Sequence, residues 1–283
     1  MTYLELYKKA VAVLTDSGCD YSDYDLTCLI EKIFGMKRLD YLAHRNETAD
    51  IDKEKEFLQS VSKRAEGYPL QYLLQSWTFM DNELFVGEGV LIPRDDTEVC
   101  VRGCMEQIDK MHIQSPVIAD LCSGSGAIAI ALAKKYPDAV ISAVELSADA
   151  FPYLQKNKEM NHADKIKLIH GNIFLCHENF PDGYFDVVIS NPPYIRTDII
   201  PTLQKEIQHE PFSALDGGLD GLIFYRCIAE KWLPKLRKGG TISLEIGEEQ
   251  ASDVCNIFRR KNISDITVMK DIQGLDRAVI IKT

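Results

Sequence analysis

"VIADLCSGSG", residues 117–126, is the stretch of sequence that decides the fold. Residues 117–120 predict a short buried strand, and the small residues and glycines after them predict a tight turn that opens a helix. Backbone N–H groups at such a turn can approach a ligand closely. Glu145 ends the next predicted strand, 19 residues after Gly126, where a carboxylate can accept hydrogen bonds from both hydroxyls of a ribose. The turn and the acid together predict a site for a nucleoside cofactor.

Around this stretch, short apolar segments alternate with amphipathic ones from residue 97 onward. We expect helices over 97–108, 126–136, 148–160, 222–236 and 251–261, and strands over 117–120, 140–145, 166–170, 185–190, 241–246 and 279–282. Short apolar strands that alternate with helices predict a parallel, doubly wound α/β sheet. Ligands of such sheets bind beyond the carboxyl ends of the strands, where the turn and Glu145 lie.

The region before residue 75 has helical periodicity instead. Thr2 with Glu5 predicts a capping box, Ser22 with Asp25 a second helix start, and Gly35 the end of that second helix. Further helices are expected over 39–44 and 52–66, and a hairpin with a turn at Asp81-Asn82 follows. We therefore expect an N-terminal helical domain over 1–74, a hairpin linker over 75–93 and a catalytic domain over 94–283. The helical domain could dock a substrate or only stabilise the chain, and the sequence leaves both open.

The turn itself favours one cofactor over others. It lacks the third glycine of the dinucleotide motif and the lysine of a P-loop. Asp120 at its start suits a ligand with positive charge, such as the ammonium and sulfonium of S-adenosylmethionine. The turn resembles the D/E-x-G-x-G-x-G motif of class I (Rossmann-like) methyltransferases, with Cys122 in place of the first glycine. That resemblance implies S-adenosylmethionine as cofactor, held by residues of one loop: Asp120, Cys122, Ser123, Gly124, Ser125 and Gly126.

A second loop, His170-Gly171-Asn172-Ile173, follows the third strand. In class I methyltransferases the matching position, usually an acid, meets the adenine amino group. Asn172 could accept that hydrogen bond through its side-chain carbonyl, and Ile173 could pack on the adenine face. A plain turn at the end of the strand is the alternative.

The most informative tetrapeptide is Asn191-Pro192-Pro193-Tyr194, which follows the strand expected over 185–190. The prolines fix the backbone and remove competing N–H donors, so the loop offers the Asn191 side-chain oxygen and the Pro192 carbonyl as fixed acceptors. Tyr194 adds an aromatic face for stacking. Two acceptors that grip an amide or amine N–H pair would orient its lone pair and stabilise the developing positive charge. We therefore expect these four residues to be catalytic in methyl transfer, with Asn191 also near the cofactor.

Several longer segments resemble the HemK/PrmC family, the protein-(glutamine-N5) methyltransferases of peptide chain release factors. The segments are 69–72, 91–98, 186–195, 210–211, 214–215, 217–222, 244–247, Asp271 and 276–277. The resemblance implies the glutamine of the Gly-Gly-Gln motif as substrate, S-adenosylmethionine as cofactor, and an N-terminal domain that helps bind the factor. Departures from the family pattern are Gln75 for a common glycine, Asp95 for a proline, Cys122 and Asn172.

Within the segment 91–98, Arg94 and Glu98 could shape the cleft, but we expect them to hold the loop and the helix start together. Glu210-Pro211 and the Gly217-Gly218 loop could form part of the cleft wall.

Composition limits the alternatives. A net charge of −11 and a pI of about 5.1 disfavour avid nucleic-acid binding, although an adenine-N6 DNA or RNA methyltransferase shares the Asn-Pro-Pro-Tyr chemistry. A ribosomal-protein glutamine methyltransferase and a non-enzymatic binding protein on this fold are further alternatives. The eight scattered cysteines suit buried thiols in a reducing cytoplasm rather than a metal site. We expect a cytoplasmic monomer without metal, signal peptide, membrane span or stably bound nucleic acid.

Overall fold

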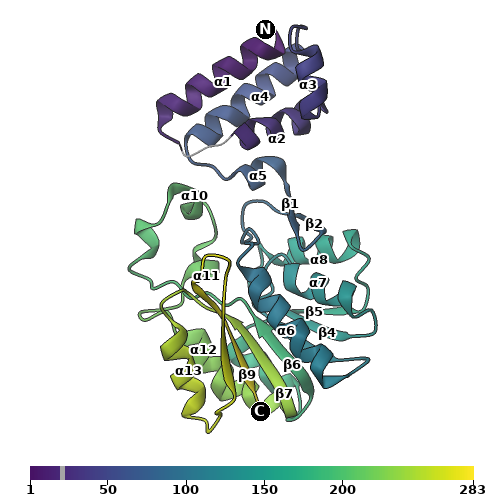
Figure 1. The fold of residues 1–283 in the computed structure, drawn as a ribbon, viewed down its shortest axis with the longest axis vertical. Coiled ribbons are helices and arrows are strands. Elements are labelled where there is room, and N and C mark those ends of the chain that lie inside the picture. The colour runs from purple at the N-terminus through teal and green to yellow at the C-terminus, as the bar shows by residue number, and fades with distance from the viewer. Residues whose placement is uncertain (20–22) are drawn as a thin grey trace. The chain divides into compact units, whose positions relative to one another are not determined.

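The computed structural model describes residues 1–19 and 23–283, and it divides the chain into two compact units (Figure 1). Unit 1 comprises Met1–Ser76 and Gln204–His209, and unit 2 comprises Trp77–Leu203 and Glu210–Thr283. None of the helices within the described residues is long and apolar enough to cross a membrane.

Unit 1 is helical, as its periodicity predicted. Its helices are α1 (Tyr3–Ser17), α2 (Asp23–Phe34), α3 (Arg38–His44), α4 (Ile51–Ala65), α5 (Leu70–Leu74) and α10 (Lys205–Gln208). The capping box is confirmed, because Thr2 Oγ1 accepts from the Glu5 backbone N–H and the Glu5 carboxylate accepts from that of Thr2. Gly35, with φ of +72°, follows the last residue of α2. The predicted start at Ser22 lies outside the described residues.

The core of unit 1 is apolar except for one buried ion pair. Leu6, Leu14, Leu26 and Phe57 are among its fully buried side chains. Arg64 on α4 is 4% exposed, and its Nε donates to Asp25 Oδ2 on α2 at 2.8 Å. Its Nη1 donates to Glu206 Oε1 on α10 at 2.7 Å. A buried guanidinium needs such partners, because an unpaired charge in a core is costly.

Unit 2 is built on a seven-stranded sheet with the order β5-β4-β3-β6-β7-β9-β8. The strands are β3 (Val117–Leu121), β4 (Val140–Glu145), β5 (Ile166–His170), β6 (Phe185–Ser190), β7 (Leu236–Glu245), β8 (Ile266–Lys270) and β9 (Asp276–Lys282). The strands from β5 to β7 are parallel. The sequence predicted a parallel sheet, and this prediction is wrong for β8 and β9, because β9 runs antiparallel to both β7 and β8. The sequence missed β8 because its residues are largely exposed at the sheet edge.

Helices cover both faces of this sheet, which makes it doubly wound (Figure 1). Alternate strand residues enter two separate cores, so Ile118 packs with α6, α7 and α8, while Ala119 packs with α12 and α13. The helices of unit 2 are α6 (Thr97–Met111), α7 (Ala127–Lys135), α8 (Phe151–Met160), α9 (Ile173–Cys176), α11 (Phe212–Leu215), α12 (Ile223–Cys227) and α13 (Ala251–Arg259). The doubly wound α/β architecture expected from the alternating strands and helices is confirmed.

Two local predictions needed correction. The helix expected over 222–236 ends as a regular α-helix at Cys227 and continues as a π turn and a 3₁₀ turn. Pro234 lies in the last turn, and it lacks the N–H that a continuous helix would need there. The hairpin of β1 (Ser76–Phe79) and β2 (Asn82–Phe85) is confirmed, but Met80 and Asp81 form its turn with φ of 45° and 63°. Two successive positive φ angles match the twist of paired strands.

Candidate active site

The site lies between β3 and β6, at the point in the sheet where the order of the strands along the chain changes direction. From β3 the chain proceeds outward to β4 and β5, and then returns to place β6 on the other side of β3. Leu121 pairs with Ser190 across the two strands, and the Ser190 hydroxyl donates to the Leu121 carbonyl at 2.7 Å. The glycine-rich turn and the Asn-Pro-Pro-Tyr turn therefore leave the sheet at adjacent carboxyl ends, the usual ligand position of such folds.

Glu145 at the end of β4 holds the glycine-rich turn in place. Its carboxylate accepts from the Gly124 N–H and from the Ser147 N–H, each at 2.7 Å. The Ser123 N–H donates to the Val144 carbonyl at 3.0 Å. Because Glu145 is only 8% exposed yet lines a cavity, its carboxylate presents its remaining lone pairs to whatever fills that space.

That cavity has a volume of 330 Å³, within the range of small-molecule sites. Predicted residues that line it are Cys122, Ser123, Gly124, Ser125, Glu145, Asn172, Ile173, Asn191 and Pro193. Lining residues that the sequence did not single out for the site include Thr97, Leu146, Ser147, Ser213 and Phe224. Leu146 could have been predicted to line the site, because it is an apolar residue directly after the acid at the strand end. The structure shows that it is exposed.

Four predicted residues do not line the cavity: Asp120, Gly126, Pro192 and Tyr194. Gly126 serves packing, because a Cβ there would lie 2.6 Å from Leu154 Cδ1 on α8. Asp120 is fully buried, and neither of its carboxylate oxygens has a hydrogen-bond partner within the described part of the chain. Burial raises the pKa of Asp120 to about 7. An unpartnered acid directly before the loop fits a cationic nucleoside better than a pyrophosphate, so the residues present fit S-adenosylmethionine.

Asn172 caps the short helix α9 in the structure. Its Oδ1 accepts from the Phe174 N–H at 2.9 Å, and Ile173 behind it is 4% exposed. The Asn172 oxygen thus has a structural bond as well as a position on the cavity wall.

The Asn-Pro-Pro-Tyr turn is held by partners from distant parts of unit 2. Asn191 Nδ2 donates to Thr97 Oγ1 on α6 at 3.1 Å, and the Tyr194 hydroxyl donates to Glu245 Oε1 on β7 at 3.2 Å. Since its nitrogen binds Thr97, the Asn191 oxygen is left as the acceptor of that side chain. The Tyr194 hydroxyl bond was not anticipated from the sequence, which indicated only an aromatic face.

The loop 217–222 packs directly on this turn. A Cβ at Gly217 would lie 2.8 Å from the Tyr194 Cα, and one at Gly221 would lie 2.5 Å from the Tyr194 carbonyl oxygen. Gln250 Nε2 also donates to that carbonyl at 2.9 Å. The two glycines are therefore needed for backbone contact with the catalytic turn, and other residues would displace it.

The segment after residue 209 forms one cavity wall. Glu210, 6% exposed, accepts from the Ile92 N–H at 3.0 Å and forms an ion pair with Arg94. The neighbouring Pro211 then lines the cavity, as the sequence allowed. The backbone carbonyl of Arg94 accepts from the Thr97 N–H at the start of α6 at 3.1 Å, as expected, while its side chain pairs with Glu210. Glu98 pairs with Arg102 one turn along the same helix.

Two departures from the family pattern share a backbone conformation. Cys122 and Gln75 have φ of +59° and +56°, in the left-handed region that glycine adopts without a steric penalty. The common glycines at these positions thus have a physical reason. Cys122 also lines the cavity, and burial raises the pKa of its thiol, so it is a neutral small side chain there.

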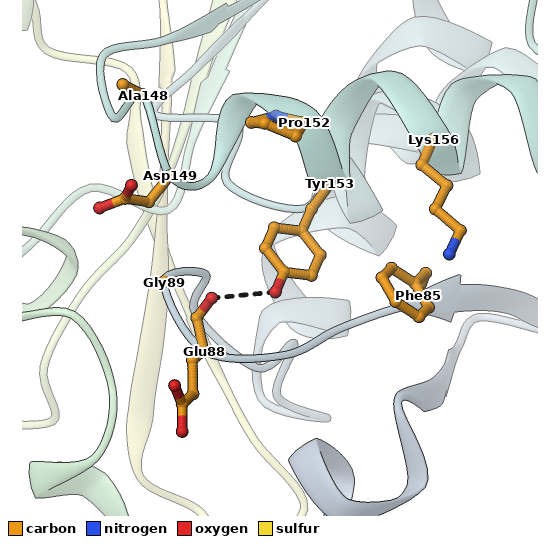
Figure 2. A pocket seen from close by; sticks show the side chains of 8 residues that line it. All are labelled: Phe85, Glu88, Gly89, Ala148, Asp149, Pro152, Tyr153 and Lys156. Carbon is orange, nitrogen blue, oxygen red and sulfur yellow. Dashed lines mark hydrogen bonds between the residues drawn. The ribbon is translucent and has the colours of Figure 1, made fainter.

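A second pocket of 530 Å³ lies on unit 2 beside the loop after β2 (Figure 2). The Tyr153 hydroxyl on α8 donates to the Glu88 carbonyl at 2.9 Å, and the Tyr153 ring stacks on Phe85. The Lys156 Nζ lies over the Phe85 ring, 3.0 Å from the ring centroid. Gly89 lines both this pocket and the cavity. The Tyr153 contacts brace the loop that carries Gly89.

Comparison with known proteins agrees with this geometry. Residues 5–74 match the PrmC N-terminal domain family, and residues 101–216 match the methyltransferase small domain family. The release factor glutamine methyltransferase of Clostridium acetobutylicum is 33% identical over 275 residues, which cover 96% of this chain and 95% of that protein. That of Geobacter sulfurreducens is 34% identical, covering 94% and 91% of the two chains.

Among solved structures, the hMettl16 catalytic domain in complex with a 3′UTR hairpin has a TM-score of 0.57 at 15% identity, covering 82% of each chain. This likeness shows the methyltransferase fold alone. With relatives this similar over nearly its full length, the protein is an S-adenosylmethionine-dependent methyltransferase. The chain belongs to the family of release factor glutamine methyltransferases.

Proposed function

We propose that this protein methylates the side-chain amide N5 of the glutamine in the Gly-Gly-Gln motif of peptide chain release factors. The observation that carries the proposal is the fixed Asn191 side chain. Its nitrogen is held by Thr97 at 3.1 Å, and it lines the cavity that Glu145 and the glycine-rich turn also line. The similar proteins of Clostridium acetobutylicum and Geobacter sulfurreducens, both release factor glutamine methyltransferases, support the same substrate.

The site residues have distinct proposed roles. Glu145 accepts from the ribose hydroxyls, Leu146 and Ile173 pack on the base, and Asn172 accepts from its amino group. Asp120 contributes negative charge opposite the ammonium and sulfonium groups. S-adenosylmethionine supplies an electrophilic methyl group when it is bound.

The Asn-Pro-Pro-Tyr turn would act on the acceptor nitrogen. An amide nitrogen is a weak nucleophile because its lone pair is delocalised into the carbonyl. Asn191 Oδ1 and the Pro192 carbonyl accept its two N–H bonds, which orients the nitrogen and stabilises positive charge as the new bond forms. Pro193 keeps the turn rigid, and the proton leaves after transfer.

We further propose that residues 1–74 bind the release factor, that 75–93 link the two parts, and that 94–283 carry the catalysis. The match of residues 5–74 to the PrmC N-terminal domain and the separate apolar core of unit 1 support this division. We propose a cytoplasmic monomer without stably bound nucleic acid, which the net charge of −11 and the eight cysteines, none of them in a disulfide in the described part of the chain, support.

The test is methyl transfer from labelled S-adenosylmethionine to a purified release factor, beside the same factor with its Gly-Gly-Gln glutamine changed to alanine. Label on the first factor only is the expected result, and equal label on both would refute the proposal. Asn191→Ala should lower turnover by about a hundredfold or more, as for loss of one fixed polar group at a reacting centre, and should leave cofactor affinity unchanged. The matched control is Asn256→Ala, an exposed asparagine on α13, which should have wild-type turnover.

A further inference from the structure

A buried carboxylate lies directly behind the Asn-Pro-Pro-Tyr turn without lining the cavity. Glu245 is the last residue of β7 and is 1% exposed. Its Oε1 accepts from the Tyr194 hydroxyl at 3.2 Å, and its backbone carbonyl accepts from the Tyr225 hydroxyl at 2.9 Å. Within residues 1–19 and 23–283, its Oε2 has no hydrogen-bond partner. A carboxylate in such a place is costly, because burial disfavours its charged form.

Thr97 holds the other half of the turn. Thr97 is 3% exposed, and its hydroxyl accepts from Asn191 Nδ2 at 3.1 Å. A hydroxyl that accepts one hydrogen bond keeps its own proton for another acceptor. Interaction with the Thr97 hydroxyl lowers the pKa of Glu245, so the Glu245 carboxylate is an acceptor available to that proton. Tyr194 is hydrogen-bonded to this acid directly, and Asn191 is hydrogen-bonded to Thr97 beside it.

We propose that Glu245 is a positioning residue for methyl transfer. As a carboxylate it accepts the hydroxyl protons of Thr97 and Tyr194, and so fixes the Asn191 side chain with its nitrogen inward and its oxygen toward the substrate. This role rests on the proposed function, because the oxygen of Asn191 is the acceptor for the glutamine amide. A protonated Glu245 is a weaker acceptor, because its hydrogen bonds are no longer assisted by charge, and Asn191 is then held less firmly in its orientation.

Charged and titratable groups surround Glu245 on every packed element. Burial, with a smaller contribution from Asp96 before α6, raises the pKa of Glu245 to about 7 against the lowering effect of Arg277 on β9. Burial also raises the pKa of Tyr194, Tyr225 and Cys100, and the charge of Glu245 raises all three a little more. Asp120 on β3 also has a pKa raised to about 7 by burial. Positioning is therefore present above pH 7 and is lost as the pH falls through that value, with Asp120 as a second group in the same range.

The central variant is Glu245→Gln, which keeps the shape but offers one acceptor oxygen and adds a donor. We expect kcat to fall by about 10–100-fold at pH 8, with KM for the release factor and the cofactor dissociation constant changed by less than about twofold. The fall in wild-type kcat between about pH 8 and about pH 6 should be smaller in the variant, since one of the two titrating acids is gone. Wild-type kcat and an unchanged pH profile in Glu245→Gln would overturn the proposal.

Two controls separate positioning from folding. Asp186→Asn removes another buried carboxylate of the same sheet, one that accepts from the Val117 N–H and pairs with Arg237. It should alter stability but leave the pH profile of kcat as in the wild type. If Glu245→Gln does not fold, Thr97→Val and Thr97→Ser decide the matter. Loss of kcat in the valine variant with recovery in the serine variant is expected, and equal kcat in both would refute the role.

Failure of the proposed function would give a different result. If the wild type does not label the release factor, the orientation of Asn191 is followed by nuclear magnetic resonance of its side-chain amide in isotope-labelled protein. These resonances should titrate near pH 7 in the wild type and in Asp120→Asn, but not in Glu245→Gln. Resonances that do not titrate in the wild type would overturn the role of Glu245 independently of the substrate.

Discussion

Asn157 offers the clearest test of how the fold supports the cofactor site. It lies on α8, is fully buried, and makes three hydrogen bonds to backbone groups of two other segments. Its Oδ1 accepts from the Phe85 N–H at 2.6 Å, and its Nδ2 donates to the Phe85 carbonyl and to the Ser125 carbonyl, each at 2.9 Å. One side chain thus ties the end of β2 to the glycine-rich turn.

Asn157→Leu keeps the branched shape of the side chain and removes all three bonds. Each bond contributes about 1 kcal/mol, and each orphaned backbone group that stays dry costs about 1–3 kcal/mol. We therefore expect a loss of about 3–5 kcal/mol in the free energy of unfolding. At about 2–3 kcal/mol per molar urea for a unit of this size, the unfolding midpoint should move down by about 1–2 M.

The assay is urea unfolding followed by tryptophan fluorescence. Both tryptophans of the chain, Trp77 and Trp232, belong to unit 2, so the signal follows the unit that contains Asn157. The matched control is Asn161→Leu, four residues along the same helix, where the side chain is partly exposed and should cost no more than about 1 kcal/mol. Equal midpoints in the two variants would refute the reasoning. Cofactor affinity in Asn157→Leu should also fall, because the turn loses its anchor at Ser125.

Other consequences of the structure are testable in the same preparations. Calorimetry should show that the affinity for S-adenosylmethionine rises from about pH 6 to about pH 8. Over this range Asp120, whose pKa is raised to about 7, becomes a carboxylate and attracts the positively charged cofactor. The same rise in affinity in Asp120→Asn would contradict this explanation. Gln75→Gly should stabilise unit 1 by about 0.5–1 kcal/mol in thermal unfolding, since relief of the left-handed backbone outweighs the extra entropy of glycine. Arg64→Met should destabilise unit 1 by about 3 kcal/mol or more, because it removes the buried guanidinium that pairs with the Asp25 carboxylate, whereas Glu206→Gln should cost less than about 1 kcal/mol, because the Glu206 side chain is 37% exposed. Thermal unfolding followed by circular dichroism should give a lower midpoint for Arg64→Met than for Glu206→Gln. Equal midpoints would mean that the buried pair is unimportant.

Local patterns in the sequence were sufficient for much of the fold. Apolar runs and helical periodicity placed the parallel strands and most helices, because burial on both faces leaves a period that neighbouring residues carry. They could not place β8, whose residues face solvent at the sheet edge, or the antiparallel direction of β9, which depends on pairing across the sheet. The irregular end of α12 depends on packing around Pro234 as well as on periodicity.

The sequence alone determined where chemistry is concentrated in this protein: the glycine-rich turn, Glu145 and the Asn-Pro-Pro-Tyr turn. Each is a contiguous motif at a strand end, so residue type and spacing were enough. Only the tertiary structure decided which distant groups support them, such as Thr97, Glu245 and Asn157, and that Asp120 lies outside the cavity wall. The physical reason is that hydrogen bonds and desolvation act through space, between residues that are tens of positions or more apart along the chain.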